Sequence, residues 1–143
     1  MADPIEVAKN AVERFNAGDW SGLRSTLTSD TVEDEFGTQR RLEGPEAVVA
    51  AAEGWKRAFP DARGTVRSAT ASGNTAILEI TWEGTQTGDL VGPQGTIPAS
   101  GRQVSLPAAW VVEIEGEKAK AVRHYFDLMT LLSQIGAVPA GAS

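Results

Sequence analysis

Three consecutive carboxylates, Glu33, Asp34 and Glu35, stand in the segment TVEDEFG, where the chain is predicted to form a short strand. Side chains alternate between the two faces of a strand, so Asp34 shares a face with Val32 and Phe36. We expect an acid between two apolar neighbours to point into the protein. A buried carboxyl has a raised pKa, which suits a general base near neutral pH. The alternative is that Asp34 is one more solvated surface acid.

His124 is the second candidate for proton transfer, because an imidazole has an unperturbed pKa of about 6.5. It lies in a predicted strand in which Val122, His124 and Phe126 share one face. This pattern predicts an inward histidine in an apolar wall. The alternative is a half-exposed residue between Arg123 and Tyr125.

Asp127 directly precedes LMTLLSQIG, which is predicted to be a short terminal helix. An acid in this place is expected to cap the helix by accepting a hydrogen bond from its first N–H groups. The same carboxylate is also close enough in sequence to orient His124, and the two roles are compatible.

Four large aromatic residues are candidates for binding a flat, apolar molecule. They are Trp55 and Phe59 on a predicted helix, with Trp82 and Trp110 on predicted strands. Aromatic side chains of this size form the walls of ligand pockets, and they form ordinary cores equally well. Both interpretations stay open from the sequence.

Composition excludes several classes of protein and site. The chain has 143 residues, a net charge of −6 and a pI near 4.8, which disfavours nucleic acid and anionic membrane surfaces as partners. It has no cysteine and one histidine, so thiol nucleophiles, thiolate metal sites and histidine clusters are excluded. No Walker loop, dinucleotide fingerprint or nucleophile elbow is present, and we therefore expect chemistry without a metal or cofactor.

The hydrophobic pattern predicts helices first and antiparallel strands afterwards. Helices are expected from a cap at Asp3 to about Phe15, after Asp19, from Gly44 to about Phe59, and over 128–135. Strands are expected at 31–36, 65–70, 76–82, 104–114 and 119–126, with 84–101 as a long loop or irregular hairpin. This order predicts one α+β domain over 1–143, with a curved antiparallel sheet around three N-terminal helices and 137–143 as a frayed tail.

Five segments together resemble the SnoaL-like polyketide cyclases of the nuclear transport factor two-like superfamily. They are ERFNAGDW, TLTSDTVEDEFG, WKRAFPDARGTV, WEGTQTGDLVGPQGT and AVRHYFDLMTLLSQIG, which span nearly the whole chain. The resemblance implies a cone-shaped fold with an internal apolar pocket, and by analogy a homodimer. Many chemistries use this fold, so the fold alone does not settle function.

The run NAGD followed by SDTVED also resembles the ketosteroid isomerases of that superfamily, where the aspartate of TVED is the catalytic base. It matches Asp34 here. The two oxyanion donors of those enzymes would fall near Ala11 and Ala109, and both are missing. Losing one such donor costs about a hundredfold to a thousandfold in rate, so steroid isomerisation by that mechanism is disfavoured.

In the SnoaL-like cyclases an acidic residue of the C-terminal hairpin serves as general acid and base, and it falls at His124 here. Gln86 replaces the histidine of the common GTH motif, so it can only hydrogen-bond a substrate. The resemblance implies aldol cyclisation or isomerisation of an apolar, carbonyl-bearing, polyketide-like molecule, with Asp34 and His124 moving protons.

Two alternatives remain open at this stage. Epoxide opening on the same fold needs two carboxylates and a basic group, for which Arg123 is the candidate. A non-catalytic module would use the same pocket only to bind an apolar small molecule. The N-terminus MADPIEVAKN has neither a basic start nor an apolar stretch, so a cytoplasmic protein is expected.

Overall fold

Two helices open the chain, and each begins at an aspartate. In the computed structural model, which describes residues 3–92 and 95–138, Asp3 caps α1 (Pro4–Ala17) and Asp19 caps α2 (Trp20–Ser25). Gly18 ends α1 with a φ of +66°, a left-handed conformation that glycine adopts without strain. The capping aspartates and the glycine confirm the helix boundaries predicted from the sequence.

A six-stranded sheet follows, in the order β2-β1-β8-β7-β4-β3, with a separate two-stranded hairpin of β5 and β6. The remaining elements in chain order are β1 (Leu27–Glu35), β2 (Arg40–Glu43), α3 (Pro45–Ala58), β3 (Arg63–Ser72), β4 (Thr75–Thr85), β5 (Leu90–Gly92), β6 (Gly95–Ile97), β7 (Gln103–Glu115), β8 (Lys118–Phe126) and α4 (Leu128–Gln134). Neighbouring strands of the large sheet are antiparallel except β1 and β8, which are parallel.

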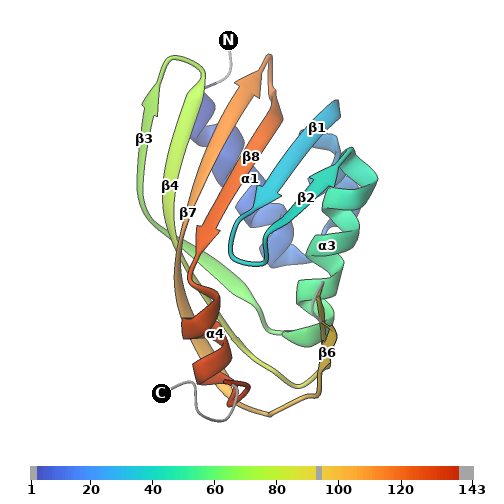
Figure 1. The fold of residues 1–143 in the computed structure, drawn as a ribbon. Helices are drawn as coiled ribbons and strands as arrows, with labels where there is room; N and C mark the ends of the chain where they lie inside the picture. The colour runs from blue at the N-terminus through green and yellow to red at the C-terminus, as the bar shows by residue number, and fades with distance from the viewer. Residues whose placement is uncertain (1–2, 93–94, 139–143) are drawn as a thin grey trace.

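The helices cover one face of this curved sheet, so the α+β architecture with three helices before the long strands is confirmed. Figure 1 shows α1 behind the strands, α3 beside the β2 edge and α4 at the far end of the sheet. Buried side chains from α1, α2, α3 and the inner faces of β4, β7 and β8 form the main core. A second cluster joins the end of α3, β7 and α4.

The strand β2 was not predicted, and it fixes the register of β1. In this antiparallel hairpin Glu35 lies opposite Arg40, and Asp34 lies opposite Arg41. Directly opposed residues point to the same face of a sheet. The hairpin therefore places one acid and arginine pair on the inner face and one on the outer face.

Two further sequence expectations concern the ends of the chain and the membrane. Of the predicted frayed tail 137–143, Ala137 donates a hydrogen bond to the carbonyl of Leu132 at 2.8 Å, and residues 139–143 lie outside the described residues. In the part of the chain that the structure describes, every helix is too short or too polar to span a bilayer.

Candidate active site

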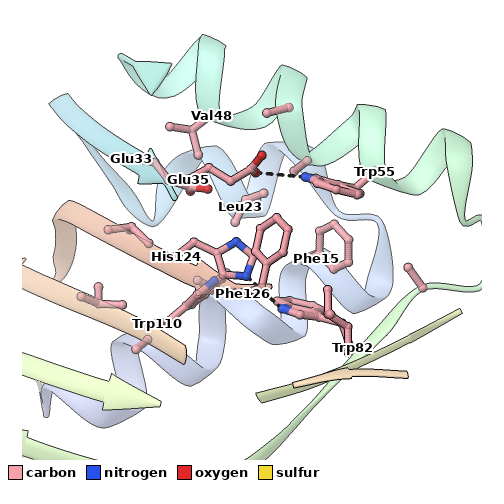
Figure 2. Close-up of a pocket in the computed structure, with 18 of the residues that line it drawn as sticks. Phe15, Leu23, Glu33, Glu35, Val48, Trp55, Trp82, Trp110, His124 and Phe126 are labelled. Carbon is pink, nitrogen blue, oxygen red and sulfur yellow. Dashed lines mark hydrogen bonds between the residues drawn. The ribbon is translucent and has the colours of Figure 1, made fainter. Parts of the chain in front are cut away.

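An apolar cavity of about 120 Å³ lies between the helices and the inner face of the sheet. Its walls come from α1, α2, α3, α4 and the long strands, and most of its surface is aliphatic or aromatic. The titratable groups that line it are Glu33, Glu35, Glu83 and His124. Figure 2 shows Glu33, Glu35 and His124 grouped at one end of this cavity.

The inward-facing acids of β1 are Glu33 and Glu35, and the expectation that Asp34 points inward is wrong. Asp34 does not line the cavity, and its carboxylate pairs with Arg41 at 3.2 Å, with 29% of its side chain exposed. Glu35 is 1% exposed. The inward-facing positions of β1 are thus one residue away from those that the apolar pattern predicted. In a strand, a shift of one residue moves every side chain to the opposite face.

One apolar neighbour of Asp34, Phe36, has its partner outside the cavity, which explains part of the difference. Phe36 lies just beyond the end of β1, is 46% exposed and stacks on Tyr125 with ring centroids 4.8 Å apart. On the inner face, Glu35 is supplied with donors that compensate its burial. The apolar residues beside Asp34 therefore predicted the wrong inward face, because one of them, Phe36, packs on Tyr125 at the surface.

Glu35 is held by three different donors. Its Oε1 accepts from the Thr38 hydroxyl at 2.5 Å and from Arg40 Nε at 2.8 Å, and its Oε2 accepts from Trp55 Nε1 at 3.0 Å. Burial alone would raise the pKa of Glu35, but these hydrogen bonds and the Arg40 charge outweigh it and hold the pKa below its usual value. Glu35 is therefore an ionised, saturated carboxylate with little basicity.

Glu33 is in the opposite situation. The residue as a whole is partly exposed, but its carboxyl lies among the apolar lining of the cavity. Burial, reinforced by the negative charge of Glu35, raises the pKa of Glu33 to about 8. A carboxyl with that pKa is mostly protonated at neutral pH and can both take up and release a proton.

His124 points into the cavity, as the strand alternation predicted. It is 8% exposed and shares the inner face of β8 with Val122 and Phe126. Burial lowers the pKa of His124 to about 4, although the Glu35 charge acts in the other direction. The imidazole is therefore neutral at physiological pH.

The hydrogen bond of Trp82 determines which nitrogen of His124 carries the proton. Trp82 Nε1–H donates to His124 Nε2 at 3.2 Å. An indole N–H has no acceptor capacity, so Nε2 is the unprotonated nitrogen and the ring proton of the neutral imidazole is on Nδ1. In Figure 2 the imidazole lies between the Trp82 indole and the two glutamates.

Glu33, Glu35 and His124 each place one potential ligand atom within 4.8 Å of the others. Two carboxylates and an imidazole can bind a divalent cation. Glu35, however, is already saturated by Arg40 and two further donors, so a cation would have to displace the guanidinium. The expectation of chemistry without a metal stays a prediction.

Asp127 caps α4 and lies outside the cavity. Its carboxylate accepts from the Met129 N–H at 3.3 Å and from the Thr130 hydroxyl at 2.6 Å. These hydrogen bonds are the main cause of its lowered pKa. The capping role is confirmed. The expected orienting of His124 by Asp127 is not, because His124 bonds to Trp82 instead.

Gln86 also lies outside the cavity, and its interpretation as a substrate-binding residue is corrected. The residue is completely buried. Its side-chain Nε2 donates to the carbonyls of Ile97 and Pro98, and its Oε1 accepts from the N–H of Ser100. Gln86 therefore fixes the segment after β6, inside the region 84–101 that was predicted as a loop or irregular hairpin.

Arg123 was the basic group expected for epoxide opening. It forms an ion pair with Glu113 at 2.5 Å and does not line the cavity. The cation that pairs with an inward-facing acid is instead Arg40. It binds Glu35 and lines a second, larger groove.

The cavity wall includes all four aromatic residues that were candidates for ligand binding: Trp55, Phe59, Trp82 and Trp110. Their binding of a ligand stays a prediction. Trp55 also borders a groove of about 620 Å³ between α3 and the β5–β6 hairpin, so its indole stands between the two spaces.

Sequence reasoning missed Glu33, Glu35, Thr38 and Arg40 as parts of the site. A signal for them exists: three adjacent acids, the four residues FGTQ and two adjacent arginines match a tight hairpin with oppositely charged residues across it. No strand was expected between Phe36 and Gly44, so the hairpin was missed.

One family of known proteins matches nearly the whole chain. The sequence model of the SnoaL-like polyketide cyclase family matches residues 5–135, which is most of the chain. This chain belongs to the SnoaL-like polyketide cyclase family. A search of curated proteins finds no match.

Solved structures place this SnoaL-like chain among relatives of low sequence identity. TsrD from Streptomyces laurentii is 26% identical, with a TM-score of 0.79 over 93% of this chain and 94% of TsrD. IdmH, a candidate polyketide cyclase from Streptomyces antibioticus, is 21% identical, with a TM-score of 0.81 over 94% of this chain and 99% of IdmH. A Catenulispora acidiphila protein with a ketosteroid isomerase-like fold is 17% identical, with a TM-score of 0.79 over 94% and 95% of the two chains.

Proposed function

We propose that this SnoaL-like protein moves a proton at the carbon next to a carbonyl group, in the aldol cyclisation or isomerisation of an apolar, polyketide-like small molecule. The observation that carries the proposal is the desolvated carboxyl of Glu33 beside a neutral His124 in an apolar cavity. A pKa close to the working pH is what a group that both accepts and donates protons requires.

Glu33 is the proton carrier in this proposal. Its ionised form takes a proton from the carbon next to the carbonyl, and the C–H electron pair passes into an enolate. In an aldol closure that carbon bonds to a second carbonyl carbon, and the resulting alkoxide receives the proton held by Glu33. In an isomerisation the proton returns to another carbon. Either sequence leaves Glu33 as it began and needs no oxidant or reductant.

His124 stabilises the negative oxygen of the enolate. Because Trp82 holds Nε2 as an acceptor, the Nδ1–H of the neutral ring is free to donate to a substrate oxygen. Glu35 is a positioning residue. Burial is the main cause of the raised pKa of Glu33, and the charge of Glu35, held in place by Arg40, raises that pKa further.

The experiment measures deuterium uptake from D₂O into the carbons next to the carbonyl of cyclohexanone, followed by NMR. We expect the wild-type protein to accelerate exchange, and Glu33→Gln to lower the rate by about a hundredfold to ten-thousandfold. Asp34→Asn is the matched control, because it makes the same change one residue away but outside the cavity, and it should keep the wild-type rate.

Wild-type exchange that Glu33→Gln leaves unchanged would contradict the proposal. A probe that binds without any acceleration of exchange would favour the binding module instead. The expected homodimer remains part of the proposal on the strength of the family resemblance. The exposed stack of Phe36 on Tyr125 is apolar surface that a second copy would cover.

A further inference from the structure

Trp110 carries a hydrogen-bond donor that the proposed chemistry does not use. Its indole Nε1 is shielded from solvent and has no acceptor among the described residues. The indole belongs to β7 and lines the cavity. A buried N–H without a partner costs free energy, so such a group in a native protein calls for an explanation.

The position of Trp110 relates this donor to His124. The two residues are directly opposite each other in the β7–β8 ladder, and their rings meet edge to face with centroids 6.0 Å apart. Trp82 lies against the same indole at 5.9 Å. Figure 2 shows Trp110 beside His124, on the side of the imidazole away from the two glutamates.

The other two indole N–H groups of the cavity are already occupied. Trp55 donates to Glu35 and Trp82 donates to His124. Among the residues that the structure describes, Trp110 is therefore the indole of this cavity whose N–H donor has no partner.

The size of the cavity limits what that ligand can be. A cavity of about 150 Å³ with apolar walls holds benzene. The present cavity of about 120 Å³ is smaller, so at most one six-membered ring or its equivalent lies inside it. Beyond the Glu33, Glu35, Glu83 and His124 side chains, its lining offers a ring mainly apolar contacts.

We propose that Trp110 Nε1–H binds a second oxygen of the substrate. The part of the substrate inside the cavity is then a ring-sized unit with two acceptor oxygens, such as a dicarbonyl or a hydroxy ketone. One oxygen accepts from His124 Nδ1–H and the other accepts from Trp110. The assignment of the first oxygen rests on the proposed function.

The test compares the binding of three neutral six-membered rings by NMR titration of ¹⁵N-labelled protein. Cyclohexanone has one oxygen, whereas 3-hydroxycyclohexanone and cyclohexane-1,4-dione have two. We expect at least one two-oxygen ring to bind about tenfold more tightly than cyclohexanone, the gain typical of one net hydrogen bond. The same ring should shift the indole N–H resonance of Trp110, identified by its absence in Trp110→Phe.

Trp110→Phe keeps an aromatic ring and removes the indole donor, so it should bind all three rings with similar affinity. Trp20→Phe makes the same change outside the cavity lining and should keep the tenfold preference. Equal affinities for the three rings in the wild type would overturn the proposal, as would a preference that survives in Trp110→Phe. The latter result would indicate that the N–H points at the ring of His124.

Binding and chemistry are separated by Glu33→Gln. If the two-oxygen preference is present in this variant while deuterium exchange is lost, both proposals stand. A preference without exchange in the wild type would overturn the proposed function alone. Exchange without a preference would overturn the role of Trp110 alone.

Discussion

The indole N–H of Trp82 donates to Nε2 of His124 at 3.2 Å, and this bond joins β4 to β8 over the inner face of the intervening strand β7. It gives the imidazole an acceptor nitrogen on one side and a donor on the other. The orientation of the only histidine in the chain is thus fixed by a residue 42 positions earlier in the sequence.

His124 is predicted to stay neutral down to about pH 4, because burial lowers its pKa. The unfolded chain takes up this proton near pH 6.5 and the folded chain near pH 4, so stability is lost as the pH falls through that window. The imidazole resonances in an NMR titration should have a midpoint near 4. Urea unfolding of His124→Gln should lack this part of the pH dependence. A midpoint near 6.5 would mean that the ring is solvated.

The two arginines of β2 provide a matched comparison of buried and exposed ion pairs. Arg40→Met leaves the 1%-exposed Glu35 without its cation, and we expect a loss of about 3–5 kcal/mol in the free energy of unfolding. Arg41→Met breaks the exposed pair with Asp34 and should cost at most about 1 kcal/mol. Urea unfolding at pH 7 measures both. Equal losses in the free energy of unfolding would show that the buried pair of Arg40 and Glu35 stabilises the fold no more than the exposed pair does.

Gln86 is expected to stabilise the protein without taking part in proton transfer. Gln86→Leu leaves the backbone partners at Ile97, Pro98 and Ser100 without their side-chain hydrogen bonds, which should cost about 1–3 kcal/mol. The same change at the exposed Gln103 should be nearly neutral. The rate of deuterium exchange catalysed by folded Gln86→Leu should match the wild-type rate. A hundredfold lower rate would show that Gln86 takes part in the reaction.

The helix boundaries and the long hairpins were predictable because local signals determine them. The caps at Asp3, Asp19 and Asp127 are side chains that bond to nearby N–H groups, so sequence position is enough to find them. The alternation in β8 likewise placed His124 on the inner face, because Val122 and Phe126 point the same way.

The identity of the inward acid was not predictable from alternation within β1, because it depends on what the other strands and loops supply. Phe36 is exposed because Tyr125, about ninety positions later, gives it a stacking partner. Glu35 is buried because Arg40 and Trp55 reach it from β2 and α3. Side-chain burial in this strand is set by tertiary partners, which outweigh the local hydrophobic pattern.

The proposed proton transfer depends most directly on the ionisation of Glu33. Its carboxyl carbon can be followed by ¹³C NMR through a pH titration, with Glu33→Gln identifying the resonance by its absence. We expect a midpoint near 8, because burial and the charge of Glu35 disfavour the ionised form. A midpoint near the ordinary 4.5 would contradict the proposed proton transfer, since Glu33 would then be a solvated carboxylate with no reserve of protons at neutral pH.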